Sequence, residues 1–126
     1  MSLTYAGRNE IAKCITGTGN VFNEVNTHLC VGDSTAVFDA SQVDLQGTTN
    51  VFRKKVDAGY PVIVDNKVTY KTTFSGTEAN YPWNEWGVAN AFSGGTMITR
   101  KVEYNGTKVA GQTWVFQVTL TIEIGA

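Results

Sequence analysis

The C-terminal run WVFQVTLTIEI, from Trp114 to Ile124, alternates between two kinds of side chain at nearly every step. One face carries the apolar side chains Trp114, Phe116, Val118, Leu120, Ile122 and Ile124. The other face carries Val115, Gln117, Thr119, Thr121 and Glu123. A period of two residues is the repeat of a β-strand, and a strand with one apolar face is half buried. The run therefore predicts a long antiparallel strand that covers one side of a core.

The same alternation recurs upstream. In the segment 67–74, alternate residues again form one face, made of Val68, Tyr70, Thr72 and Phe74. The pair Asp65-Asn66 separates this segment from 61–64, and both residue types tolerate the backbone of a two-residue hairpin turn. The pair Gly94-Gly95 predicts a second hairpin, between the segments 83–91 and 97–104. Shorter strands are expected over 27–32 and 51–56.

A helical pattern is present over residues 3–15, where Ile11, Cys14 and Ile15 fall on one face. Thr4 can cap this helix at its start, and Gly17 can end it. Residues 33–50 are instead polar. We expect them to form a long surface loop, held by the apolar anchors Val37, Phe38, Val43 and Leu45.

Composition agrees with a β protein. The chain has 126 residues, of which 42% are hydrophobic, 17% are charged and 13 are glycine. A chain of this length buries roughly two-thirds of the surface that its unfolded form exposes, so it can fold without disulfides or structural metal ions. Abundant Thr, Val and Asn favour strands and turns. The predicted fold class is mainly β, an antiparallel β-sandwich or flattened barrel of about seven strands with one short N-terminal helix. It forms a single domain over residues 1–126.

Charge and hydropathy narrow the possible partners. The formal net charge is -1, and the densest basic run is Arg53-Lys54-Lys55, whose side chains alternate between the faces of a strand. This is weak support for a nucleic-acid partner, which needs clustered cations. No apolar run reaches the roughly 18 residues of a membrane span, so no membrane partner is expected. Residues 1–7 lack the features of a standard secretion signal, which favours maturation in a cytoplasm.

The cysteines and the histidine suggest no reaction. Cys14 and Cys30 are expected as buried free thiols in a reducing compartment, with a disulfide as the alternative. They form no CxxC motif and no Cys/His cluster, so a redox or metal pair is not expected. His28 is the sole histidine and lies in a predicted strand. No serine stands in the glycine pattern of a nucleophile elbow, and we expect no cofactor and no enzymatic activity.

Three aspartates in the polar loop, Asp33, Asp39 and Asp44, raise the hypothesis of a calcium site. Their spacing does not match an EF-hand loop, and aspartates in such segments usually form turns. We therefore expect turn formation and no metal. The triplet Asn105-Gly106-Thr107 matches a glycosylation acceptor, but without a secretion signal it is read as a turn.

Glu85 stands out because it lies between Trp83 and Trp86 in a segment that should be largely buried. An unpaired carboxylate in such a place is costly, so Glu85 needs a cationic partner. Arg53 and Arg100 are the candidates, and Arg100 lies across the predicted glycine hairpin. A structural ion pair is favoured over a catalytic carboxylate, because no second acidic group lies at a suitable spacing.

Aromatic residues cluster near the same segment. Tyr81, Trp83, Trp86 and Tyr104 could form a platform that stacks on sugar rings. Aromatic residues at strand positions more often belong to a core or a subunit interface. The first three are therefore kept as residues of a possible interface or glycan contact.

Several sequence blocks resemble those of small virion structural proteins of tailed bacteriophages. In the second half of the chain these are Asn-x-x-Trp-Asn-Glu-Trp-Gly-Val from Asn80 to Val88, Gly94-Gly95-Thr96-Met97, Arg100, Lys108 and the Trp114 strand. In the first half they are Leu3-Thr4-x-Ala6-Gly7-Arg8-Asn9, Val31-Gly32-Asp33-Ser34 and Asp44-Leu45-Gln46-Gly47. Similar blocks occur in head decoration proteins and in tail components.

The resemblance implies a virion protein assembled in the cytoplasm of a host bacterium. A decoration, or cement, protein would bind the outside of the major capsid lattice and stabilise the shell, as a homo-oligomer for which a trimer is favoured. Its partners would be the major capsid protein or other virion proteins. The alternatives are a tail, neck, baseplate or fibre component and a carbohydrate-binding module on the virion. The polar loop and the N-terminal residues are the expected contact surface.

Overall fold

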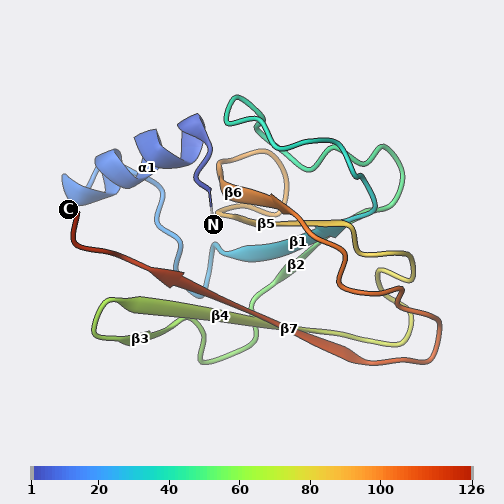
Figure 1. Ribbon diagram of the computed structural model, residues 1–126. Coiled ribbons are helices and arrows are strands. Elements are labelled where there is room, and N and C mark those ends of the chain that lie inside the picture. Colours follow the sequence, from blue (N-terminus) through green and yellow to red (C-terminus); the bar gives the residue numbers. More distant parts are fainter. Residues whose placement is uncertain (1, 126) are drawn as a thin grey trace.

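Two antiparallel sheets face one another in this computed structural model, which describes residues 2–125 (Figure 1). In chain order the elements are α1 (Tyr5–Ile15), β1 (His28–Gly32), β2 (Val51–Lys55), β3 (Val62–Val64), β4 (Lys67–Phe74), β5 (Glu85–Ala89), β6 (Met97–Val102) and β7 (Trp114–Thr121). The larger sheet has the strand order β2-β1-β5-β6, and the smaller has the order β3-β4-β7. The expectation of a mainly β fold with seven strands and a short N-terminal helix is confirmed.

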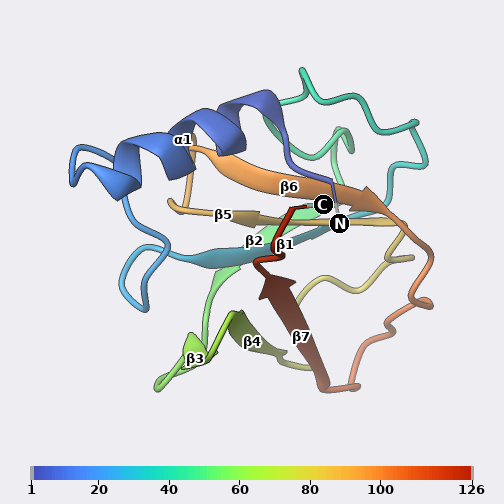
Figure 2. The ribbon, with the colours of Figure 1, turned by 60° about the vertical axis from the view of Figure 1, so that its left-hand side comes forward.

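The helix begins where its capping residue predicts. The Thr4 side-chain oxygen accepts a hydrogen bond from the Gly7 amide at 2.8 Å, and α1 follows directly. Thr4 also binds β6, because its amide donates to the Ile98 carbonyl at 3.1 Å and its hydroxyl donates to the Met97 carbonyl at 2.6 Å. A side chain at Gly7 would meet the Ile98 backbone, so the helix packs closely on β6 (Figure 2).

Residues with positive φ form the turns of the two predicted hairpins. Asp65 adopts the left-handed backbone conformation, with φ of 52°, between β3 and β4. Gly94 and Gly95 do the same at 65° and 63° in the connection from β5 to β6. Both hairpins were predicted from these residue types, which tolerate positive φ at little cost.

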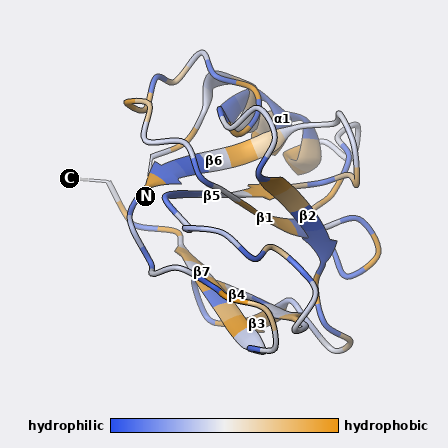
Figure 3. Cartoon of the chain, turned by 90° about the vertical axis from the view of Figure 1, so that its right-hand side faces the viewer, coloured by the Kyte–Doolittle hydropathy of each residue, from blue (hydrophilic) through white to orange (hydrophobic). Residues whose placement is uncertain are grey.

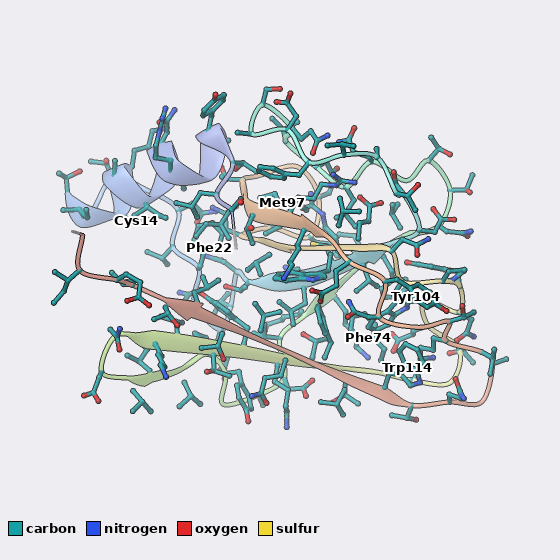
Figure 4. The ribbon with its side chains drawn as sticks, viewed as in Figure 1. Cys14, Phe22, Phe74, Met97, Tyr104 and Trp114 are labelled. Carbon is teal, nitrogen blue, oxygen red and sulfur yellow. The ribbon has the colours of Figure 1, made fainter. Side chains whose placement is uncertain are left out.

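The main core fills the space between the sheets. Trp83 is its centre, with ring centroids 5.0 Å from both Phe74 and Trp114 in edge-to-face contacts. Phe74 and Trp114 lie together at the end of the sandwich away from Cys14 (Figure 4). Trp83 and Phe74 are 2% and 0% exposed, so this aromatic cluster contributes much of the hydrophobic free energy.

The alternation of the C-terminal run holds within β7 and fails beyond it. Val118 is buried and Val115 is 59% exposed, as a period of two requires. Ile122 and Ile124 share the inward face in sequence, yet they are 71% and 98% exposed. The prediction that both cover the core is wrong, because the smaller sheet ends at Thr121 and both side chains lie beyond it, largely in solvent.

A smaller apolar cluster lies on the other face of the larger sheet, formed by Cys30, Leu45, Ala89 and Met97. Leu45 belongs to the polar loop, so the loop is anchored there as predicted. Val37 and Val43, expected as further anchors, are instead 85% and 66% exposed. Hydropathy changes along two strands of the larger sheet: β2 runs from apolar to charged residues, and β6 begins with apolar residues and carries Arg100 and Lys101 near its end (Figure 3).

Candidate functional site

The most elaborate polar arrangement centres on Glu85, the first residue of β5. Its Oε1 accepts a hydrogen bond from Nε of Arg100 at 2.8 Å, and both side chains are fully buried. Strand register brings them together, because Arg100 lies opposite Gly87 on the neighbouring strand β6. Gly32 makes room on the other side, since a Cβ there would lie 2.5 Å from Oε2 of Glu85.

Three backbone amides of the polar loop also donate to the Glu85 carboxylate. The Gln46 amide donates to Oε1 at 2.7 Å, and the Gly47 and Ser34 amides donate to Oε2 at 2.8 and 3.2 Å. With Arg100, the carboxylate therefore accepts four hydrogen bonds. Charge-assisted bonds of this kind are about twice as strong as neutral ones.

Arg100 holds the middle of the same loop. Its Nη1 donates to the side-chain carbonyl of Gln42 at 3.0 Å, and its Nη2 donates to the backbone carbonyl of Ala36 at 3.0 Å. The pair thus fixes both halves of the loop from beneath. The Glu85 carboxylate is fully buried, and all four of its hydrogen bonds go to this loop or to Arg100.

Arg53, the other predicted partner of Glu85, is engaged elsewhere. Its Nη2 contacts Asp44 at 3.1 Å, and its Nη1 donates to the carbonyls of Ala91 at 2.8 Å and Gly94 at 3.0 Å. The prediction of an Arg53–Glu85 pair is wrong because β1 lies between their two strands. Two strand spacings separate β2 from β5 by about 10 Å, and Arg53 is in register with Gly87 and not with Glu85.

The loop runs beside the N-terminal segment on the outside of the larger sheet (Figures 1 and 2). The Tyr5 amide donates to the Ala40 carbonyl at 2.8 Å, which joins the start of α1 to the loop. Tyr5 is 54% exposed and carries the Arg8 guanidinium 5.2 Å from its ring centroid. We call the exposed side chains of Tyr5, Val37 and Val43 the loop surface.

The aspartates of the loop act separately. Asp39 accepts hydrogen bonds from the amide and hydroxyl of Ser41 at 2.8 and 2.6 Å, and these bonds lower the pKa of its carboxyl group. Asp33 accepts from the Asn50 amide group at 2.8 Å, and Asp44 binds Arg53. No group of three His, Cys, Asp or Glu side chains within residues 2–125 could hold a metal ion. The turn interpretation holds for Asp39, whereas Asp33 and Asp44 bind distant side chains.

The aromatic residues do not form a platform. Trp83 and Trp86 are 2% and 6% exposed and belong to the core, and the Tyr81 hydroxyl donates to the Val31 carbonyl at 2.8 Å. Burial, followed by the charge of Asp33, raises the pKa of Tyr81 well above its usual range. The prediction of a glycan or interface contact is therefore wrong for Trp83 and Trp86, whose rings lie in the core between the sheets, and it stays a prediction for the partly buried Tyr81.

The cysteines are free thiols, and His28 lies in β1 as expected. Cys30 is fully buried, and burial raises its pKa to about 12, whereas Cys14 is partly buried on α1. His28 contributes Nδ1 to a hydrogen bond with the Asn26 carbonyl at 2.9 Å and touches the ring of Phe92. No catalytic partner contacts this imidazole among the residues that the structure describes.

Lys108 is the polar residue whose structural role sequence reasoning missed. It is 1% exposed, and its Nζ donates to the Ser75 carbonyl at 2.6 Å and to the Asn80 side chain at 2.8 Å. This ammonium group ties the connection after β6 to the connection after β4. The sequence holds no local signal for it, because its acceptors lie about thirty residues away along the chain.

Comparisons with known proteins add no assignment. No helix in residues 2–125 is long and apolar enough to cross a bilayer. No model of a known protein family matches the sequence, and no curated protein matches it at a significant level.

Proposed function

We propose that the protein is a structural component of a tailed-bacteriophage virion, namely a capsid decoration protein that binds the outside of the major capsid lattice and stabilises the shell. The sequence blocks that resemble small virion proteins support this assignment. Two of these blocks, residues 31–34 and 44–47, supply amides to Glu85, and the block 80–88 supplies Glu85 itself. The resemblance thus coincides with the network that shapes the polar loop.

One observation carries the proposal: the long polar loop is held in a fixed shape by a buried ion pair. A loop that is ordered before binding loses little conformational entropy when it meets a partner. The loop surface then offers the exposed side chains of Val37, Val43 and Tyr5. A protein that binds many equivalent lattice sites in this way stabilises the assembled shell by mass action.

Quantitative mass spectrometry of purified particles tests the proposal through the copy number of this chain relative to the major capsid protein. A near-equal ratio supports a decoration protein that covers the shell. A ratio of a few percent would overturn the capsid assignment in favour of a tail, neck or baseplate component. Absence of the chain from the particles would overturn a virion role altogether.

A binding assay tests the loop surface directly. Purified protein is added to particles from a phage lacking the gene, and the bound fraction is measured by sedimentation. We expect the double variant Val37→Ser/Val43→Ser to bind at least about tenfold more weakly, since exposed apolar side chains lose their burial at the interface. The control Val21→Ser/Val25→Ser changes equally apolar, exposed residues outside the loop. Equal binding by the two variants would refute the assignment of this surface.

A further inference from the structure

The smaller sheet ends in an uncovered strand. Within residues 2–125, β7 pairs with β4 on one side and with no strand on the other. Its eight residues, from Trp114 to Thr121, include no charged side chain and no proline. Natural proteins usually protect a free edge of this length with lysine, proline, a bulge or a covering segment. This edge has none of the first three.

The backbone groups that point outward can be identified. The Ile122 amide donates to the Asn66 carbonyl at 2.9 Å, so Ile122 directs its backbone groups toward the β4 side. Hydrogen-bonding direction alternates along an antiparallel strand. Gln117, Thr119 and Thr121 therefore direct their amides and carbonyls to the free edge, and they can pair with an added strand.

An apolar groove lies beside this edge, between the two sheets. Its volume is about 680 Å³, and it is lined on one side by Leu120 and Ile122 and on the other by Leu3, Ile11 and Ile98. A second hollow of about 300 Å³ adjoins it at Thr119, which lines both, and this hollow is lined by Trp86 and Phe116 together with the paired charges of Lys101 and Glu103. The buried Nε1 of Trp86 has no hydrogen-bond partner within residues 2–125.

The segment after β7 exposes apolar side chains at the rim of this groove, which Ile122 itself helps to line. Ile122 and Ile124 follow β7, share the face of Leu120, and are 71% and 98% exposed. Figure 3 shows the residues after β7 leading away from both sheets. An uncovered groove and an uncovered apolar segment thus lie at the same end of the same strand.

We propose that two copies of the protein pair through the free edges of β7, so that Ile122 of each copy packs beside Leu120 in the groove of the other and Ile124 reaches the second hollow beside Val118. The pairing is antiparallel, with a twofold axis at Thr121. Thr121 of one copy then lies opposite Thr121 of the other, and Thr119 lies opposite residue 123 of the other copy. Thr119 and Thr121 direct their backbone groups to the free edge, as members of hydrogen-bonded pairs must.

The same register places the isoleucines correctly. Ile122 of one copy lies opposite Leu120 of the other, and Ile124 lies opposite Val118, on the inward face. A shift by one residue would turn both isoleucines outward, because side chains alternate with a period of two. Glu123 falls on the outer face beside Thr119, so no like charges meet across the axis. The contact is isologous and closes at two copies.

This inference is independent of the proposed function, and it differs from the trimer that the sequence resemblance favoured. Sedimentation equilibrium or light scattering of the purified chain is expected to give twice the 13.7 kDa mass. The double variant Ile122→Ser/Ile124→Ser should dissociate at least about 100-fold more readily, because each copy loses the burial of two isoleucines, four in the dimer. It should keep its circular dichroism spectrum, since both residues are exposed in the single chain. A monomeric or trimeric wild-type mass, or open-ended aggregation, would overturn the proposal.

A matched control removes two other exposed isoleucines. Ile15 and Ile63 are 82% and 69% exposed and lie on α1 and β3. The variant Ile15→Ser/Ile63→Ser should dimerise as the wild type does. Equal weakening by both double variants would show a non-specific apolar effect and would overturn the assignment to the β7 edge.

Cross-linking tests the register. In a Cys14→Ser background, Thr121→Cys should form a disulfide between copies, because hydrogen-bonded neighbours have Cα atoms about 5.5 Å apart, within disulfide reach. Thr119→Cys alone should not cross-link, but a mixture of Thr119→Cys and Glu123→Cys chains should. Absence of the Thr121→Cys cross-link, or efficient cross-linking by Thr119→Cys alone, would refute this pairing.

Discussion

Glu85→Ala should be among the most destabilising single substitutions in this protein. The change removes the carboxylate but leaves the Arg100 guanidinium, which is 1% exposed, without a counter-charge. Breaking a buried ion pair from one side typically costs 3–5 kcal/mol, and we expect about 4 kcal/mol here. Amides that lose their acceptor contribute within this range, because the loop can open to hydrate them.

Urea unfolding followed by tryptophan fluorescence measures this loss, with thermal unfolding as a second readout. For a domain of this size, about 4 kcal/mol corresponds to a fall in melting temperature of roughly 15 °C. The double variant Glu85→Ala/Arg100→Met removes both charges. It should lose less stability than Glu85→Ala alone, because no buried charge is left without a partner.

Asp44→Ala is the matched control. It breaks the Asp44–Arg53 pair, in which the aspartate side chain is 58% exposed, and exposed pairs contribute at most about 1 kcal/mol. A loss below about 1 kcal/mol for Glu85→Ala would refute the reasoning, since it would mean that the Arg100 charge is readily hydrated. A double variant less stable than Glu85→Ala would refute it as well.

Two further predictions concern the core. Phe74→Ala should lower the free energy of unfolding in urea by about 3–5 kcal/mol, because Phe74 is 0% exposed and its loss leaves a cavity beside the indole cluster. The control Phe92→Ala, at a residue 72% exposed, should change that free energy by less than about 0.5 kcal/mol. Similar losses for both variants would contradict the core assignment. In a Cys14→Ser background the Cys30 thiol, whose pKa burial raises to about 12, should not react with a thiol reagent at pH 8 until the protein unfolds. The folded chain keeps this proton where the unfolded chain loses it, so Cys30 should lower stability as pH rises above about 9, by up to about 1.4 kcal/mol per pH unit. Urea unfolding midpoints are measured at pH 8 and pH 10.5 for the wild type and for Cys30→Ala. If the midpoint falls by the same amount in both proteins, Cys30 makes no such contribution.

Much of the fold follows from short-range patterns in the chain. The alternation over β4 predicted its bounds, Lys67–Phe74, and Thr4 predicted the start of α1. Asp65 and the glycine pair at 94 and 95 predicted two hairpins. These features are local, because a period, a cap or a turn depends on residues within a few positions of one another.

The candidate site was predictable only in part. A buried carboxylate between two tryptophans predicts a cationic partner, and Glu85 does pair with Arg100. Its amide partners in the polar loop gave no signal, because they lie about forty to fifty residues away along the chain. The Lys108 contacts were missed for the same reason.

The sequence by itself determined the strands, their inward faces and the requirement for a partner at Glu85, since these depend on side-chain chemistry along one segment. Tertiary structure decided which arginine met that requirement, because the order β2-β1-β5-β6 puts Arg100 on the neighbouring strand and Arg53 beyond β1. It also buried Trp83 and Trp86 and left Ile122 and Ile124 uncovered. An apolar side chain is buried only where another segment packs over it, and which segments pack together depends on the fold of the whole chain.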